Sequence, residues 1–289
     1  MHEPTIEIKI KKLLHKLSNS NNSKKYADIS VIIPCYQAEK TLVRAVSSII
    51  NQTLLPKEII LINDASTDNT LSLLKLFEKS NPTLIKTLSL DSNQGVSHAR
   101  NCGWKIASQP YICFLDADDA WHPMKIQVQY EYMTKNKTVF MSGLKSSRLS
   151  PTNFDSQIDK SYSHSHVNIQ TKEIKKNSLI FKNPFTTSTV MLLNTSEFRF
   201  TENKRYAEDI LLWQQIIFSG KKAMLLNEYL AYSFKHAYRD PGLSSNLYSM
   251  EKEELKNFIF LYKKNLISPT QLFYSYAFSL IKLIKRILF

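Results

Sequence analysis

Hydrophobic and polar positions along the first half of the chain predict strands that alternate with helices. Four largely apolar runs have the pattern of strands buried on both faces of a sheet: residues 29–36, 57–64, 83–90 and 110–119. Three segments between them place apolar side chains at helical spacing: residues 40–52, 66–79 and 95–108. We expect Ser66 to be the N-cap of the second helix. This alternation predicts a parallel sheet wrapped by helices.

The pattern is coarser after residue 120. The elements expected there are a helix, a strand, a helix and a pair of strands, at residues 122–135, 187–193, 205–220 and 222–234, followed by two final helices. The composition of residues 145–178 predicts a variable irregular segment, and the turn-forming residues in 235–250 predict a loop. In the last helix, Ser268 is placed as N-cap and Gln271 lies three residues later, which is the arrangement of a capping box.

These patterns divide the chain into three expected parts. Residues 1–27 are an amphipathic and then polar N-terminal segment, and residues 28–235 are the α/β body. Residues 236–289 are expected to hold a mobile loop and the C-terminal helices, as a helical extension of the body.

Charge and composition narrow the possible partners. The chain has 289 residues and a net charge of +13, of which residues 1–25 and 251–289 supply eight. Basic ends suit an anionic membrane surface, whereas the aromatic and basic motifs of RNA-binding modules are absent, so we expect no nucleic acid. Three Cys are too few for a disulfide framework and indicate a reducing compartment. No apolar run reaches the roughly 18 residues that would span a bilayer.

Polar side chains follow each predicted strand of the first half. They are Tyr36, Asn63, Asp64, Asp91, Asn93, Asp116, Asp118 and Asp119. Ligands bind at the carboxyl ends of parallel strands, and carboxylates gathered there repel one another unless a cation joins them. Oxygen ligands and a phosphate-bearing substrate suit Mg²⁺ or Mn²⁺. The first strand–helix turn has neither a Walker loop nor a dinucleotide fingerprint. The acids could instead simply cap the next helix.

Four sequence blocks carry a family resemblance. ISVIIPCYQAEKTLVRAVSSIINQT, EIILINDASTDNT, NQGVSHARNCG and YICFLDADDAWHP resemble, in this order, the family 2 inverting glycosyltransferases of GT-A fold. KNPFTTSTVMLL and RYAEDILLW are similar to the acceptor side of that family. The resemblance covers residues 29–235. Two departures exist: Asn63 stands where the family usually has an acid, and the Q-x-x-R-W signature of processive synthases is missing, which implies addition of one sugar per encounter.

The resemblance implies a fold and a set of site residues. The fold is a single Rossmann-like mixed sheet flanked by helices. The residues that it assigns to nucleotide-sugar binding are Pro34, Tyr36, Asp64, Arg100, Asp116 and Asp118. In this assignment Pro34 and Tyr36 flank a uracil, Asp64 accepts its N3–H, and Arg100 reaches the base or diphosphate. The alternatives are that Arg100 pairs with a nearby acid and that Tyr36 packs at the edge of the core.

The same resemblance implies the catalytic and metal residues. Asp118 is the expected metal ligand, with Asp116 bound to the ribose or to metal-bound water. Asp209 is the candidate general base, with Glu208 beside it, although Asp209 could be an ordinary acid at a helix start. His236 is a further candidate, in a loop that closes over the diphosphate and metal.

The implied reaction is metal-dependent transfer of a hexose, with inversion, from a UDP-sugar to a saccharide or lipid-linked acceptor in surface polysaccharide or lipopolysaccharide biosynthesis. A non-catalytic binding module on the same fold and a sugar-nucleotide nucleotidyltransferase are the alternatives, and the oligomeric state stays open. We expect a cytoplasmic protein, peripheral on the inner face of a bacterial membrane.

The last helix is the expected anchor. Its apolar side chains recur at helical spacing: Phe273, Tyr276, Leu280, Ile284 and Ile287. Packing of this helix on the domain or on a partner chain is the alternative.

Overall fold

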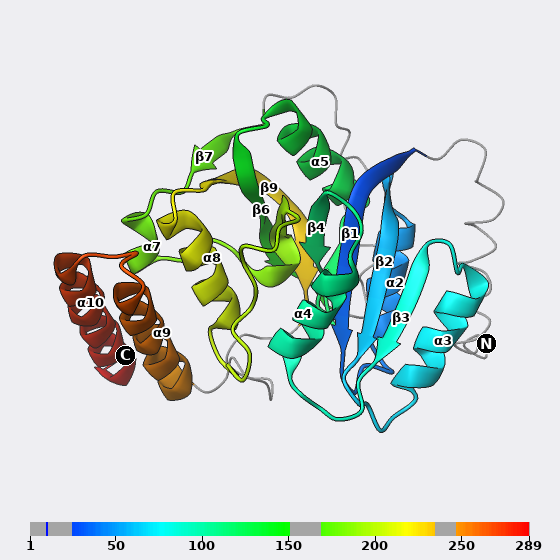
Figure 1. The fold of residues 1–289 in the computed structure, drawn as a ribbon, viewed down its shortest axis with the longest axis horizontal. Coiled ribbons are helices and arrows are strands. Elements are labelled where there is room, and N and C mark those ends of the chain that lie inside the picture. The colour runs from blue at the N-terminus through cyan, green and yellow to red at the C-terminus, as the bar shows by residue number, and fades with distance from the viewer. Residues whose placement is uncertain (1–9, 11–24, 151–168, 235–246, 289) are drawn as a thin grey trace.

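The computed structural model describes residue 10 and residues 25–150, 169–234 and 247–288. Within these ranges nine strands form one mixed sheet, in which eight follow the order β3-β2-β1-β4-β8-β6-β9-β5 and β7 pairs with β9 (Figure 1). The expected mixed sheet is thereby confirmed.

The first half of the sheet is parallel. Strands β1 (Tyr26–Cys35), β2 (Leu55–Asn63), β3 (Ile85–Ser89) and β4 (Tyr111–Phe114) all run in the same direction. Helices α2 (Leu42–Ile50), α3 (Thr70–Ser80) and α4 (Val96–Ile106) connect them. The carboxyl ends of these strands therefore meet at one edge, as the alternating pattern predicts.

The second half of the sheet mixes directions. Strand β8 (Val190–Leu193) pairs antiparallel with β4 and with β6 (Val139–Arg148), and β9 (Lys222–Ser233) runs parallel to β6. The short strands β5 (Ala120–Trp121) and β7 (Thr171–Glu173) pair antiparallel with β9.

Helices cover both faces of the sheet and give two hydrophobic cores. Helices α2, α3 and α5 (Lys125–Lys135) pack on one face, and α4 and α8 (Glu208–Phe218) pack on the other. Ile33 belongs to the first core and its neighbour Ile32 to the second, and both are fully buried. Consecutive side chains of β1 therefore enter opposite cores, which explains its continuous apolar run.

The C-terminal helices α9 (Leu247–Lys263) and α10 (Pro269–Leu288) lie side by side near α7 (Ser178–Phe181) and α8 (Figure 1). The capping box at the start of α10 is confirmed. The Gln271 backbone N–H donates to Ser268 Oγ at 3.1 Å, and the Ser268 N–H donates to Gln271 Oε1 at 2.9 Å.

The start of α3 differs from the expectation. The helix begins at Thr70, not near Ser66, because the intervening residues form a side-chain-stabilised turn. The Ser66 N–H donates to Asn63 Oδ1 at 3.1 Å, and the Thr70 N–H donates to Asp68 Oδ1 at 3.0 Å. Short polar side chains that bind nearby backbone compete with helix formation, so the predicted Ser66 N-cap is wrong.

The predicted strand pair at 222–234 is also wrong, because β9 is one strand of 12 residues. The polar residues Asn227 and Glu228 lie where the register with β6 shifts between Gly143 and Lys145. They form an irregularity in the strand instead of a turn.

Two predicted irregular segments contain regular structure. Within 145–178, β6 continues to Arg148 and β7 follows at residue 171, while residues 151–168 lie outside the described part. Within 235–250, α9 already begins at Leu247. The polar Ser and Lys side chains at the end of β6 interrupt its apolar pattern, which is why the sequence did not predict a strand there.

Candidate active site

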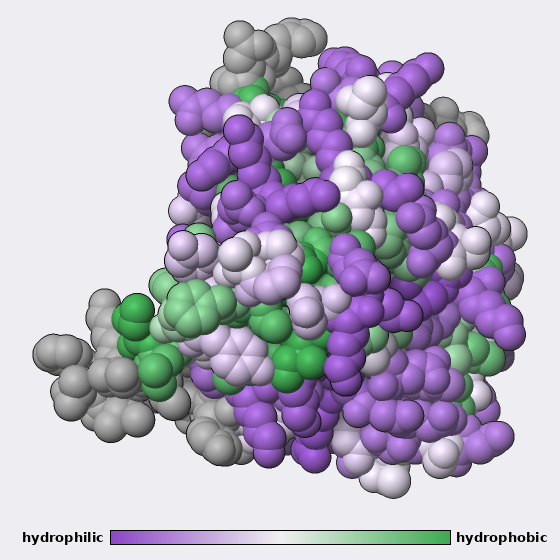
Figure 2. Space-filling view, turned by 60° about the vertical axis from the view of Figure 1, so that its left-hand side comes forward, coloured by the Kyte–Doolittle hydropathy of each residue, from purple (hydrophilic) through white to green (hydrophobic). Residues whose placement is uncertain are grey.

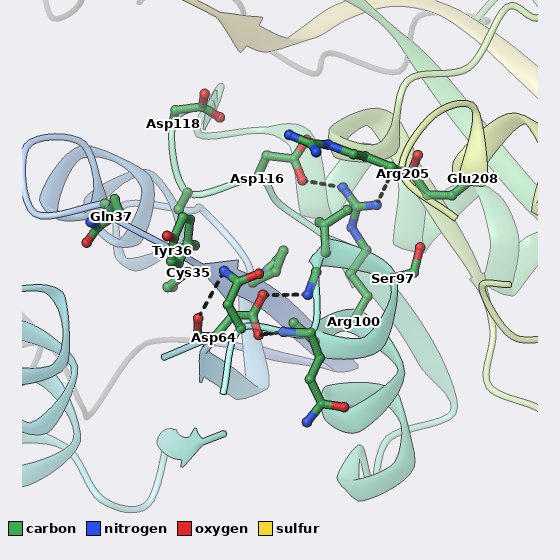
Figure 3. A pocket seen from close by; sticks show the side chains of 18 of the residues that line it. Cys35, Tyr36, Gln37, Asp64, Ser97, Arg100, Asp116, Asp118, Arg205 and Glu208 are labelled. Carbon is green, nitrogen blue, oxygen red and sulfur yellow. Dashed lines mark hydrogen bonds and ion pairs between the residues drawn. The ribbon is translucent and has the colours of Figure 1, made fainter. Parts of the chain in front are cut away.

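A cleft of about 1070 Å³ lies at the carboxyl ends of β1, β2 and β4, against the start of α8 (Figure 3). Most predicted site residues line it: Pro34, Tyr36, Asp64, Arg100, Asp116, Asp118 and Glu208. Asp209 follows Glu208 in the first turn of α8. His236 lies outside the described residues. Residues from distant parts of the sequence therefore meet as the strand order predicts.

Asp64 fixes one end of the cleft. It follows β2 directly and is buried. Its Oδ1 accepts the Gln94 N–H at 2.8 Å and its Oδ2 accepts the Gly95 N–H at 2.9 Å. These amides precede α4, and Gly95 has a φ of 87°, which favours glycine. Asp64 thus positions the start of α4, and each of its oxygens can accept one further hydrogen bond.

Tyr36 stands at the rim of the same end, with 53% of its surface exposed, while Pro34 is buried below it. The turn after Tyr36 is tied to the next loop, because Gln37 Nε2 donates to Thr67 Oγ1 at 2.9 Å and the Ala38 N–H donates to Thr70 Oγ1 at 2.8 Å. An aromatic ring held at an open rim can stack on a planar group.

Arg100 is buried between two acids. Its Nη2 lies 2.8 Å from Asp116 Oδ1, and its Nη1 lies 3.0 Å from Glu208 Oε1 (Figure 3). Burial by itself lowers the pKa of Arg100, but the charges of Asp116 and Glu208 outweigh this and raise it. The guanidinium is therefore permanently charged and directed at the two carboxylates. Its predicted contact with a nucleotide stays a prediction.

The acidic loop (residues 116–119) connects β4 to β5. The carbonyl oxygen of Asp118 accepts from Arg44 Nη2 at 2.7 Å, and Asp119 Oδ2 accepts from Ser188 Oγ at 2.6 Å. Asp116 and Asp118 line the cleft.

The acidic loop offers two carboxylates, Asp116 and Asp118, to a divalent cation. Among the described residues, no group of three or more His, Cys, Asp or Glu side chains could hold a metal ion. Mg²⁺ and similar cations use one or two carboxylates together with substrate phosphates, and Asp116 and Asp118 supply that number of carboxylates.

Asp209 is the carboxylate with the most perturbed environment in the site. Its Oδ2 accepts from Thr187 Oγ1 at 3.1 Å, and its Oδ1 accepts the Ile210 N–H at 2.7 Å. Burial, and then the neighbouring charge of Glu208, raises the pKa of Asp209 to about 7, against a lowering effect of Arg100. A carboxylate with this pKa can take up a proton near neutral pH, as a general base must.

Three site residues escaped the sequence reasoning. Thr187 and Ser188 contact Asp209 and the acidic loop, respectively, and their hydroxyls in a Ser- and Thr-rich segment gave no distinguishing signal. Arg205 is exposed and lines the cleft (Figure 3), and within the described residues it has no ion-pair partner. Its position three residues before Glu208 was the only available signal.

The sequence matches the family model for glycosyl transferase family 2 over residues 30–199. Two curated relatives from Escherichia coli, WfgD and WfaP, are each named UDP-Glc:alpha-D-GlcNAc-diphosphoundecaprenol beta-1,3-glucosyltransferase. WfgD is 39% identical over 115 residues, which is 40% of this chain and less than half (44%) of WfgD. WfaP is 32% identical over 209 residues, which is 72% of this chain and 78% of WfaP.

Two solved structures share the fold. S. aureus TarS in complex with UDP-GlcNAc has a TM-score of 0.65 at 19% identity, covering 86% of this chain and 69% of that chain. Mannosyltransferase PcManGT from Pyrobaculum calidifontis, in complex with GDP-Man and Mn²⁺, has a TM-score of 0.62 at 14% identity, covering 95% and 81%. At these identities the likeness concerns the fold, and it confirms the expected GT-A architecture.

The raised pKa of Asp209 predicts a pH-dependent gain in stability for Asp209→Asn. Because the folded-state pKa lies above the ordinary value of 3.8, the stability contributed by this carboxyl is complete below about pH 4 and is lost as the pH rises through about 7. Asparagine carries no charge, so the variant should melt about 2–4 °C above the native protein at pH 8, with a smaller gain at pH 5.

Thermal unfolding at the two pH values measures this, with the exposed Asp91→Asn as control. A gain that is absent at pH 8, or larger at pH 5, contradicts the assigned environment of Asp209.

Proposed function

The chain belongs to glycosyl transferase family 2, and we propose that it transfers one hexose per encounter, with inversion, from a UDP-sugar to a saccharide or lipid-linked acceptor. The single observation that carries this proposal is the cleft that gathers Asp64, Asp116 and Asp118 on one side and Glu208 on the other, with Asp209 next to Glu208 in the first turn of α8. We assign this chemistry to residues 28–235.

The donor would lie along the strand ends. The Tyr36 ring is exposed for stacking on a uracil, and Asp64 has lone pairs for its N3–H. The nucleotides bound to TarS and PcManGT, which share this fold, support a nucleotide-sugar donor. Arg205 offers a cation for substrate phosphates, because the other two cations lining the cleft are paired: Arg100 with Asp116 and Glu208, and Lys204 with Glu253.

Asp118 and Asp116 would hold Mn²⁺ or Mg²⁺ together with the donor diphosphate. When bound, such a cation would offset the negative charge that develops on the departing UDP. The Mn²⁺ bound to PcManGT supports a divalent cation in this fold.

Asp209 would act as the general base. An acceptor hydroxyl attacks the anomeric carbon from the face opposite the diphosphate, its proton passes to an Asp209 carboxylate oxygen, and the carbon–oxygen bond to UDP breaks. One displacement inverts the configuration, so an α-linked donor gives a β-glycoside. Glu208 is occupied by its ion pair with Arg100, which leaves Asp209 as the acid suited to this step.

A lipid-linked diphosphate acceptor agrees with the names of WfgD and WfaP, and it would place the enzyme at a membrane surface. None of the helices in the described residues is both long and apolar enough to cross a membrane. We propose peripheral attachment through residues 236–289 to the inner face of a bacterial cytoplasmic membrane, in surface polysaccharide or lipopolysaccharide biosynthesis.

The supporting feature is the orientation of α10. Five of its apolar side chains are exposed, namely Phe273 (69%), Tyr274, Tyr276, Leu280 and Ile281, whereas Ser275 and Ser279 are buried against the molecule. Lys282 pairs with Glu251 at 3.0 Å and with Glu254 at 2.6 Å, so polar groups join α9 to α10. Figure 2 shows apolar side chains gathered on this side. Helices that lie in a membrane interface expose such a face. The side chains of Ile284 and Ile287 lie outside the described part.

Asp209→Asn should lower transfer to an acceptor by about 10²–10⁴-fold while UDP-sugar binding is retained, because a positioned base contributes a factor of that order. UDP release measures turnover, and calorimetry measures binding. Unchanged turnover removes Asp209 from the mechanism, and a native protein that binds UDP-sugar without turnover favours the binding-module alternative.

UDP-hexoses should raise the melting temperature more in the presence of Mn²⁺ than in its absence, and Asp118→Asn should abolish the difference. The exposed Glu173→Gln is the matched control. An equal shift with and without the cation would rule out the proposed metal dependence.

Replacing Leu280 and Ile281 together by Ser should reduce sedimentation with phosphatidylglycerol vesicles about tenfold or more. The reason is that two aliphatic side chains that would enter the membrane interface are lost. Tyr229→Ser, an exposed aromatic on β9, should leave binding unchanged. Full binding by the double variant means that α10 is not the anchor.

A further inference from the structure

One turn contacts both the candidate base and the acidic loop. It is the 3₁₀ helix η2 (Thr187–Thr189), which leads into β8. Thr187 Oγ1 donates to Asp209 Oδ2 at 3.1 Å. The next residue, Ser188, donates through Oγ to Asp119 Oδ2 at 2.6 Å and accepts the Asp116 N–H at 3.2 Å. Two consecutive hydroxyls thus bind the candidate base and the acidic loop.

The turn itself is firmly held. Thr186 and Thr189 form a capping box, in which Thr189 Oγ1 accepts the Thr186 N–H at 3.3 Å; the same hydroxyl also donates to the Thr186 carbonyl at 2.7 Å. Gln129 Nε2 donates to the Thr189 carbonyl at 3.0 Å, and Trp121 Nε1 donates to the Ser188 carbonyl at 2.7 Å. All three residues of η2 are buried. A buried turn with its carbonyls bound on two sides is a rigid support.

We propose that Thr187 and Ser188 are positioning residues that fix the Asp209 carboxylate relative to the acidic loop. This inference rests on the proposed function, because it concerns the base and the donor-binding loop of the same site. An acceptor oxygen must lie within hydrogen-bond reach of the base and in line with the bond that breaks, and a small displacement of the base or of the acidic loop reduces the rate. The Thr187–Ser188 pair sets that separation.

The two hydroxyls have different tasks. The charged groups that act on Asp209 in the described residues are Glu208, which disfavours its ionised form, and Arg100, which favours it. The Thr187 hydroxyl also favours the ionised form by hydrogen bonding to it. Ser188 instead holds the backbone of Asp116 and the side chain of Asp119, so its loss should loosen the donor-binding loop.

Thr187→Val keeps the side-chain shape and removes the hydroxyl. We expect kcat to fall about 10-fold and the acidic limb of its pH profile to move upward by about one pH unit, because the ionised base loses a hydrogen bond. Thr187→Ser should restore both. Ser188→Ala should raise the KM for the donor about 10-fold with the limb unmoved.

Thr189→Val is the matched structural control, because Thr189 Oγ1 bonds only within the capping box among the described residues. It should lower the melting temperature and leave the acidic limb in place. A limb that moves equally in Thr189→Val, or that stays in place in Thr187→Val, overturns the inference.

A readout that needs no turnover separates this inference from the proposed function. Carboxyl ¹³C NMR titration of Asp209 should give a higher pKa in Thr187→Val than in the native protein, with Asp209→Asn assigning the signal. If that pKa rises while Asp209→Asn keeps full transferase activity, Asp209 is not the general base, but the effect of the Thr187 hydrogen bond on Asp209 is supported. If that pKa does not change, the positioning role fails whatever the activity.

Discussion

The buried guanidinium of Arg100 holds the site together. A charge removed from water must be paired, and Arg100 satisfies this with Asp116 from the loop after β4 and Glu208 from the start of α8. It comes from α4, and Asp64 after β2 binds the backbone amides of Gln94 and Gly95 just before that helix. The strand ends and the α8 side of the cleft are thus joined through one cation.

This arrangement gives the acids in and beside the cleft different partners. Asp64 is bound by two backbone amides, and Glu208 shares the Arg100 cation with Asp116. Asp209 accepts one hydrogen bond from a hydroxyl and one from a backbone amide, and it has no ion-pair partner among the described residues. Burial and the charge of its neighbour Glu208 therefore raise its pKa. The raised pKa of Asp209 is the property that suits it to take up a proton in the proposed reaction.

The C-terminal helices suggest how such a site would meet a lipid-linked acceptor. In most surface helices the apolar face turns inward, but in α10 Ser275 and Ser279 are buried while larger apolar side chains such as Phe273, Leu280 and Ile281 are exposed. The polar contacts of Lys282 with Glu251 and Glu254 hold the helix in this orientation. The proposed membrane contact rests on this exposed apolar side of α10.

The sequence by itself determined the parallel half of the sheet, the capping box at Ser268 and the cluster of acids at the strand ends. Each of these depends on local periodicity, or on the rule that parallel strands end at one edge. Only the tertiary structure decided that Arg100 binds Asp116 and Glu208, that Thr187 reaches Asp209, and that Asn227 and Glu228 lie within β9 instead of forming a turn. Those contacts join residues with no fixed spacing in sequence, and packing of distant elements alone brings them together.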